Sequence, residues 1–313
     1  MKWLGLGLAA ALALAAAVLL GPTHVPWNAL GSSEIIRTLR LPRAILAFLV
    51  GGALGLAGAG LQALVRNPLA DPFLLGLSGG AGLGAVIAIA LHWGGPWTLP
   101  LAAFVGALLA MGLVYWLGLV AGTELDPRTL ILAGVAVGSF AGAVTTAIVS
   151  LASAVDLRNA LLWLWGGLSG ASWEAVLVVC VYLPLPVAVL LAAARPLDLL
   201  ALGEEPARYL GTDVTRVRRR VYVAASLLTA AAVAVSGVVG FVGLVVPHAM
   251  RALWGHQHRA LLPAAFLGGG TLLVLADTVA RVAVAPRELP VGIVTALVGV
   301  PVFALLVRRW TAS

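Results

Sequence analysis

Asp277 is the clearest candidate for chemistry, because it is the one acid well inside a long apolar run, residues 261–284. Acids at such positions are costly and often belong to ion or proton pathways. Arg281 follows four residues later, which places the two side chains together on one face of a helix. Two roles are open for Asp277, an ion or proton relay and a structural ion pair, and the spacing favours the pair.

A second candidate is Ser78, because Gly76-Leu77-Ser78-Gly79-Gly80 matches the G-x-S-x-G nucleophile pattern. A serine nucleophile needs a histidine base within hydrogen-bond reach. His92 lies about four helical turns away at 3.6 residues per turn, and His248 belongs to another segment. A chain with 37 glycines produces this pattern by chance, so an intramembrane serine hydrolase is disfavoured.

The remaining polar residues predict neither a metal site nor a nucleotide site. His248 is expected to pack between helices, and His256 and His258 are expected to be solvated in a polar turn. Lys2 is the only lysine, whereas a phosphate-binding P-loop requires a lysine inside G-x-x-x-x-G-K-[ST]. The chain is therefore not expected to be an enzyme, and ATP-driven work requires a separate subunit.

The elements that position these residues are transmembrane helices. The chain is 62% hydrophobic and 10% charged, and its mean hydropathy is +1.08. Apolar runs of about 20 residues recur throughout, which is the length that spans a bilayer as a helix. The net charge of +7 does not point to nucleic acid, because the arginines lie in short connections between these runs. Cys180 stands alone and cannot form an internal disulfide.

The fold class that follows is an all-α polytopic membrane protein, with residues 1–313 as one transmembrane domain. Its first apolar segment also resembles a signal peptide, but a first membrane span is preferred. The eighth segment is too short to cross the bilayer alone and needs non-helical backbone from residues 237–243. The ten predicted passes are 3–20, 44–64, 73–91, 98–120, 129–150, 173–194, 221–240, 243–254, 261–284 and 291–307.

An even number of passes places both termini on one side of the membrane. Thirteen of the 19 basic residues fall on that side and six on the other. Because basic residues concentrate in cytoplasmic loops, both termini are predicted to be cytoplasmic, in a bacterial inner membrane.

Two connections stand out. The inner connection, about 195–220, contains a predicted short helix pair around Leu199–Gly211 with exposed apolar and charged side chains. Long connections in a compact chain tend to be functional, and docking of another protein is the natural use. The outer segment, about 156–169, is amphipathic and predicts a helix at the membrane interface.

The fifth predicted span has a stripe of small residues on one face. Small residues at this spacing usually allow close helix packing, which is the interpretation that the residues alone favour. The stripe consists of Gly134, Gly138 and Gly142, with Ser139, Thr145 and Thr146 nearby.

Several motifs in fixed order give the chain a specific resemblance. They are Arg40–Arg43, Gly60–Leu64, Asn67–Pro72, Leu202–Glu204, Gly240–His248, His258–Arg259, Ala276–Arg281 and Glu288–Ala296. Together they resemble the FecCD-type permeases of ABC importers that take up ferric siderophores, haem and cobalamin. The similarity extends from about residue 37 to the C-terminus.

The resemblance implies a type II ABC importer architecture, with a homodimeric permease, two ATPase subunits and a substrate-binding protein. ATP and Mg²⁺ then belong to the ATPase, and the chain itself is expected to bind no cofactor, metal or nucleic acid. In the family, Arg40, Arg43 and Arg281 match positions that receive carboxylates of the binding protein, which suits the planar fork of arginine. Interfacial snorkelling is the alternative for the first two.

The resemblance also assigns ATPase coupling to the inner helix pair. The matching residues are Leu202, Gly203, Glu204, Glu205, Ala207, Arg208, Leu210 and Gly211. In the family the fifth span lines the translocation path, so the resemblance makes its small and weakly polar residues path candidates. These are Gly134, Gly138, Ser139, Gly142, Thr145 and Thr146. An ion-coupled secondary transporter using Asp277 and a hydrolase using Ser78 remain the rival functions. The cargo stays open among an iron siderophore, haem and cobalamin.

Overall fold

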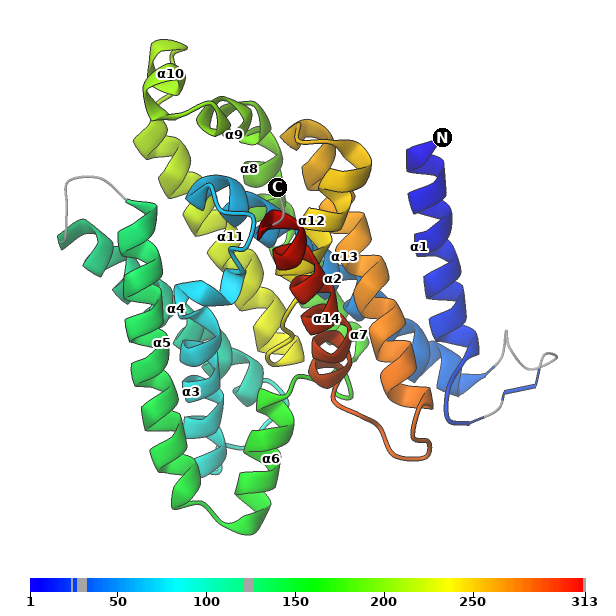
Figure 1. The fold of residues 1–313 in the computed structure, drawn as a ribbon. Coiled ribbons are helices and arrows are strands. Elements are labelled where there is room, and N and C mark those ends of the chain that lie inside the picture. Colours follow the sequence, from blue (N-terminus) through cyan, green and yellow to red (C-terminus); the bar gives the residue numbers. More distant parts are fainter. Residues whose placement is uncertain (24, 27–32, 121–125, 312–313) are drawn as a thin grey trace.

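The computed structural model describes residues 1–23, 25–26, 33–120 and 126–311, with the side chains of 305–311 left aside. Within these ranges the chain is helical and contains no strand. Helix α1 (Lys2–Leu19) is followed by a π-helical turn, η2 (Ile35–Arg40), which continues directly into α2 (Leu41–Val65). Figure 1 shows these helices as part of one bundle.

The second group of helices begins after a tight turn. A short 3₁₀ helix, η3 (Pro72–Leu75), leads through Gly76, whose φ of +74° suits glycine, into α3 (Leu77–Ala90). Helices α4 (Thr98–Val120) and α5 (Pro127–Ser150) follow, and Asp126 caps the start of α5. Because α3 is much shorter than α4 and α5, it covers only part of their length.

The middle of the chain forms shorter helices. Helix α6 (Ala154–Leu164) lies where the outer interfacial helix was predicted, but it ends five residues earlier than expected. The sixth predicted span is two helices, α7 (Trp173–Tyr182) and α8 (Pro184–Ala192), because Pro184 and Pro186 interrupt the helical hydrogen bonds. Helices α9 (Ala194–Ala201) and α10 (Glu204–Tyr209) form the predicted short pair.

The last four helices contain the predicted broken segment. Helix α11 (Val214–Ser236) stops before a non-helical stretch, and α12 (Val242–Trp254) starts after Phe241, which has a φ of +69°. Helix α11 begins seven residues earlier than the predicted span 221–240. Helices α13 (His258–Val282) and α14 (Val291–Thr311) complete the chain.

Seven helical segments of the described chain are long and apolar enough to cross a membrane. Helices α3, α12 and α14 are shorter in apolar length but occupy three of the ten predicted passes. Helix α12 has only 13 residues, and the non-helical backbone expected before it is present at residues 237–241. The ten predicted passes therefore all correspond to helical segments.

Helices α2 and α13 form the centre of the bundle. A Cβ atom added at Gly51 or Gly55 of α2 would lie 2.3 Å from a backbone oxygen of α13, Gly269 O or Ala265 O. Such close backbone contact is typical of small residues between transmembrane helices. The small residues of the sequence thus allow α2 and α13 to pack closely at the centre of the bundle.

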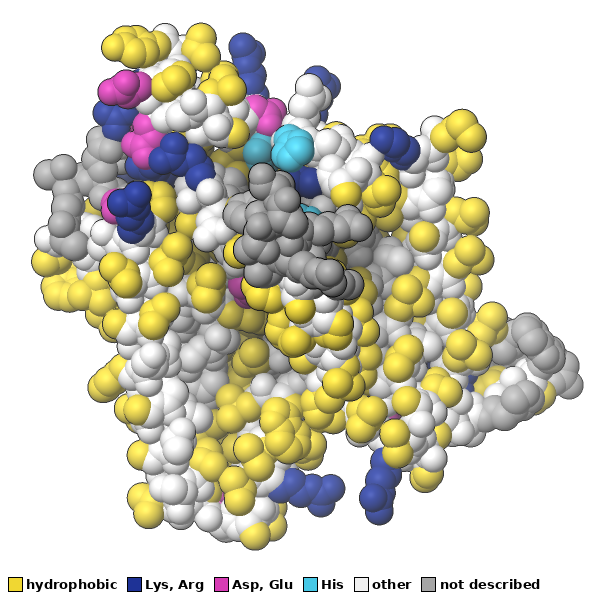
Figure 2. All heavy atoms as spheres, in the orientation of Figure 1, with side chains coloured by type: hydrophobic (Ala, Val, Ile, Leu, Met, Phe, Trp, Pro, Cys, Tyr) yellow, Lys and Arg dark blue, Asp and Glu magenta, His cyan; other side chains and the backbone are white. Residues whose placement is uncertain are grey.

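On the face shown in Figure 2, most charged side chains lie at one end of the bundle and a few lie at the opposite end, with hydrophobic and uncharged atoms between them. One end holds α9, α10 and the start of α1, and we refer to it as the α10 end. The opposite end holds α6 and the start of α14 and is the α6 end. The side chains of Arg308 and Arg309, which were counted on the inner side, lie outside the described residues.

Candidate functional site

The predicted docking arginines and Asp277 come together at the α6 end. Asp277 is buried, with 1% of its side chain exposed, and two arginines hold it. Arg43 binds it through Nε and Nη2, at 3.0 and 2.9 Å from Oδ1. Arg281 Nε lies 3.1 Å from Oδ2. The ion pair expected from the i, i+4 spacing is confirmed, with Arg43 as a second partner from another helix.

Glu288 completes this cluster from the connection between α13 and α14. Its Oε2 accepts a hydrogen bond of 2.8 Å from Nη1 of Arg43. The same guanidinium therefore holds a buried carboxylate with one edge and an exposed carboxylate with the other. Glu288 belongs to a motif of the sequence, but no local signal paired it with Arg43, because 245 residues separate the two.

Arg40 and Arg281 bind the end of α1. Arg40 Nη1 donates to the carbonyl oxygens of Val18 and Leu19, at 3.0 and 2.8 Å, and its Nη2 donates to the Thr23 carbonyl. Arg281 Nη2 donates to Ala17 O at 2.9 Å. The last carbonyls of a helix have no partner within the helix and bear partial negative charge. The two arginines satisfy these groups, which explains how both can be buried.

This geometry restricts the docking prediction. Arg40 and Arg281 are buried and their guanidinium groups face groups of the same chain. Arg43 is the most accessible of the three, with 13% of its side chain exposed. All three line a hollow of about 230 Å³ at the α6 end, which also includes Glu288 and Ser169. Docking by these residues stays a prediction, with Arg43 as the one that a partner reaches first.

The helix pair α9–α10 projects from the opposite end of the bundle (Figure 1). Gly203 separates the two helices with a φ of +121°, a conformation that only glycine adopts readily. Ala207 is fully buried and anchors α10 to the body. Asp198 of α9 accepts hydrogen bonds from the backbone N of His258 at 2.9 Å and contacts its Nδ1 at 2.6 Å. His258 is therefore buried, and the expectation that it is solvated was wrong.

The outer surface of α10 offers apolar side chains to solvent. Leu202, Leu210 and Tyr209 are exposed, and Tyr209 is 90% exposed. Glu205, Arg208 and Gly211 lie among them, also exposed. Exposed aromatic and leucine side chains rimmed by charges are typical of a protein-binding surface. Tyr209 was missing from the predicted coupling residues, although it lies within the same predicted helix pair.

Glu204 differs from its neighbour Glu205 because its carboxylate turns toward the bundle. Its Oε1 pairs with Nη2 of Arg218 on α11 and lies 3.5 Å from Nη2 of Arg66, at the end of α2. Glu204 thus contacts residues of α2 and α11 as well as α10, with 32% of its side chain still exposed.

The small-residue stripe of α5 is mainly a packing surface. A Cβ at Gly134 would lie 2.2 Å from the Leu74 carbonyl oxygen, and one at Gly138 would lie 3.4 Å from Gly76. At Gly142 the same atom meets nothing within 4 Å. Thr145 is buried, whereas Ser139 and Thr146 are exposed. Ser139, Gly142 and Thr146 therefore remain available to line a path, and Gly134 and Gly138 pack against the turn before α3.

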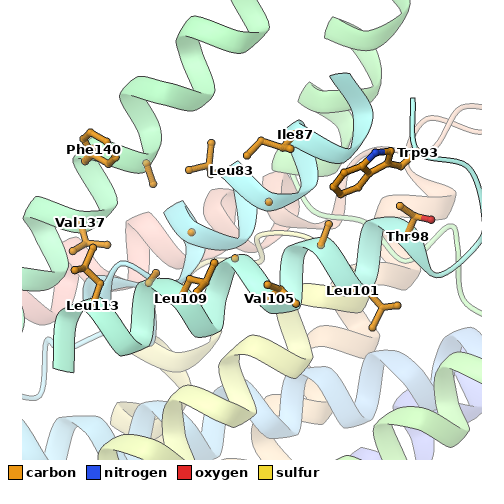
Figure 3. A pocket seen from close by; sticks show the side chains of 16 residues that line it. Leu83, Ile87, Trp93, Thr98, Leu101, Val105, Leu109, Leu113, Val137 and Phe140 are labelled. Carbon is orange, nitrogen blue, oxygen red and sulfur yellow. The ribbon is translucent and has the colours of Figure 1, made fainter. Parts of the chain in front are cut away.

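Two larger apolar hollows lie between helices of the bundle. One, of about 600 Å³, lies between α3, α4 and α5, and Val137, Phe140 and Ala141 of α5 line it rather than the predicted path residues (Figure 3). The other, of about 620 Å³, lies between α6, α14 and the broken segment 237–241, with Phe241 and Leu297 in its wall. Helix α14 thus contributes a wall that the sequence analysis did not assign.

The geometry does not favour Ser78 as a nucleophile. Ser78 is the second residue of α3, and His92 lies just beyond the other end of that helix, with its Nε2 3.4 Å from Oδ2 of Asp156. No histidine of the described residues forms a hydrogen bond with Ser78. Likewise, the described residues contain no group of histidine, cysteine or acidic residues suited to a metal ion.

Comparison with known proteins places this arrangement in a family. The chain is 47% identical over 274 residues to the cobalamin import system permease protein BtuC of Halobacterium salinarum, covering 88% of this chain and 73% of that protein. It is 44% identical over 277 residues to the hemin transport system permease protein HmuU of Yersinia pestis, covering 87% and 82%.

A solved structure agrees with these relatives. The fold superimposes with a TM-score of 0.88 on a metal-chelate type ABC transporter in an inward-facing conformation, at 31% identity and 98% coverage of both chains. The FecCD transport family matches residues 5–309. Since this match includes both the arginine cluster and the α9–α10 pair, the chain belongs to the FecCD transport family.

Proposed function

We propose that this chain is the transmembrane permease subunit of an ABC importer for a bulky metal chelate. A substrate-binding protein delivers the chelate, and alternating access moves it across the membrane. The observation that supports this most directly is the α9–α10 pair, an exposed apolar and charged surface on a chain with no P-loop lysine. Such a surface suits docking of the ATPase that the chain lacks.

The ATPase subunits hold ATP and Mg²⁺, and the permease performs no catalysis. Helix α10 inserts into a cleft of the ATPase and follows its opening and closing. Leu202, Tyr209 and Leu210 supply the apolar contact, with Glu205 and Arg208 at its rim. In this orientation, the α10 end and both termini lie on the cytoplasmic side of a bacterial inner membrane.

The permease functions as a homodimer. Helices α5 and α14 each expose apolar side chains in the single chain, such as Leu132 and Phe140 on α5 and Leu297 and Val300 on α14. A second copy covers part of these faces, and the rest borders the translocation path. Ser139, Gly142 and Thr146 are the path residues of α5, and Phe241 and Leu297 face the hollow beside α14.

The test is uptake by proteoliposomes that contain the permease with its ATPase and binding protein. Cobalamin and hemin are the probes, because two relatives are named for them. Uptake is expected to require ATP and the ATPase, to persist when ion gradients are collapsed, and to survive Ser78→Ala. Uptake by the permease alone, driven by an ion gradient, would overturn the proposal. The two arginines on Asp277 already disfavour an ion-coupled role.

A further inference from the structure

The first residue of α10 connects the coupling surface to the interior of the bundle. Glu204 Oε1 pairs with Arg218 of α11 and lies 3.5 Å from Arg66 Nη2. Glu205, the next residue, is exposed, so two adjacent acids have different surroundings. A role as a surface contact fits Glu205, whereas the Glu204 carboxylate is paired with arginines of α11 and α2, although 32% of its side chain is exposed.

Arg218 depends on this contact. Only 5% of its side chain is exposed, and its Nε has no hydrogen-bond partner among the described residues. A buried guanidinium without a counter-charge is strongly destabilising. Glu204 supplies that charge, so α10 cannot separate from α11 without leaving Arg218 unpaired.

Arg66 extends the contact to the central helix. It terminates α2 in a left-handed conformation, with a φ of 54°, and α2 runs through the core to Arg43 at the α6 end. Small residues hold α2 tightly against α13, as at Gly51 and Gly55. A displacement of the α2 end therefore acts on a closely packed helix rather than on a flexible loop.

We propose that Glu204 is a positioning residue whose carboxylate joins α10 to α11 and α2, and that this joint transfers movement of the coupling helix to the core of the permease. The inference rests on the proposed function, because it assumes that an ATPase moves α10. It assigns Glu204 to transmission inside the chain and leaves recognition of the ATPase to the exposed residues of α10. Arg218 and Arg66 are the receiving groups.

The first test uses the purified permease without partners and follows hydrogen exchange across residues 204–220. Glu204→Gln removes the charge but keeps the size of the side chain. Exchange is expected to rise in α10 and at the start of α11, whereas Glu205→Gln, the neighbouring exposed acid, leaves the start of α11 as protected as before. Equal exchange in both variants would overturn the joint, and this result does not depend on the transport function.

The second test uses the reconstituted complex and compares cargo moved with ATP hydrolysed. In Glu204→Gln the ATPase still co-purifies and hydrolyses ATP, but cargo moved per ATP falls about fivefold or more, which is comparable with the smallest typical effects of one site on another in allosteric proteins. Glu34→Gln, the same change on an exposed acid at the α6 end, is the matched control. A proportional fall of uptake and hydrolysis, or loss of the ATPase, would contradict a transmission role.

A shorter acid separates position from charge. Glu204→Asp keeps the charge but withdraws the carboxylate by one methylene, and it serves as the second variant if Glu204→Gln does not fold. The joint predicts an intermediate ratio of uptake to hydrolysis for this variant. A wild-type ratio in Glu204→Gln would refute the inference even where ATP-driven uptake itself is established. Absence of ATP-driven uptake in the wild-type complex would instead refute the proposed function.

Discussion

The arginine cluster at the α6 end and the helix pair at the α10 end differ in what their side chains contact. In the arginine cluster, Arg40, Arg43 and Arg281 are bound by carboxylates and carbonyls of the same chain. In the helix pair, Leu202, Tyr209 and Leu210 contact little of the chain and face outward. One region is closed on itself, and the other is open to a partner.

The difference comes from what lies nearby in space. The arginines lie beside the carbonyl end of α1 and the buried Asp277, and these acceptors of the same chain bind their guanidinium groups. Helix α10 has six residues and one buried anchor, Ala207, so most of its surface has nothing to pack against. Substitutions at the first region should therefore damage the fold, and those at the second should damage assembly.

The largest effect is expected from Asp277→Asn. This change leaves Arg43 and Arg281 without their shared buried counter-charge, and breaking a buried pair in this way costs about 3–5 kcal/mol. The free energy of unfolding, measured by SDS titration in mixed micelles, should fall by this amount. Glu174→Gln, which alters an exposed acid near the same end, is the control. An unchanged transition in Asp277→Asn would show that the cluster is not structural.

A smaller loss of stability is expected from Arg40→Gln. One amide group can replace only part of the hydrogen bonds that Arg40 donates to Val18, Leu19 and Thr23. Hydrogen bonds to charged groups contribute about 1.5–3 kcal/mol, so a loss in this range is expected, with earlier proteolysis at the end of α1. Arg158→Gln, on an exposed arginine of α6, should change neither the free energy of unfolding nor the rate of proteolysis at the end of α1. Normal stability with weakened binding-protein docking would restore the docking role for Arg40.

Sequence periodicity and punctuation predicted most of the fold. Prolines, glycines and apolar runs predicted the ten helical passes, and the short eighth pass predicted the broken backbone before α12. Where the prediction differed, the cause was local chemistry that hydropathy does not register. Pro184 divides α7 from α8, and polar residues extend α11 at its start because Asp213 caps it.

The site was less predictable, because its contacts join distant segments. The i, i+4 spacing predicted Asp277 with Arg281, but nothing in the sequence indicated that α1 would present its carbonyls to Arg40 and Arg281. Glu204 and Glu205 are equivalent as a sequence pattern, and only the position of Arg218 separates them. Residue types thus indicated where polar chemistry gathers, and tertiary contacts decided which side chains remain accessible.

Tyr209→Ala tests the open region. Because Tyr209 is exposed, its loss should leave the stability of the purified permease in place. Affinity for the ATPase should fall about tenfold, or about 1.4 kcal/mol, as expected for an aromatic anchor of moderate strength. Leu253→Ala, an exposed leucine on α12, provides the comparison at the same end of the bundle. Equal ATPase affinity in both variants would show that Tyr209 of α10 does not contact the ATPase.

The smallest effect on stability is expected from Glu288→Gln, and this variant tests whether the arginine cluster can also bind a partner. Its carboxylate is partly exposed, and exposed ion pairs contribute about 0–1 kcal/mol. The same change is expected to strengthen docking of the substrate-binding protein. Glu288 occupies Nη1 of Arg43, the donor that the predicted docking of a binding-protein carboxylate also requires.

Removing that competing charge should tighten binding of the substrate-binding protein to the complex in nanodiscs, whereas Arg43→Gln should weaken it. Glu34→Gln, an exposed acid at the same end, controls for the general change in surface charge, and higher salt should reduce the difference between the variants. If Glu288→Gln and Glu34→Gln raise affinity equally, the effect belongs to the overall field of the α6 end. If affinity for the binding protein rises only in Glu288→Gln, Arg43 binds its partner by exchanging the Glu288 carboxylate for a carboxylate of that protein.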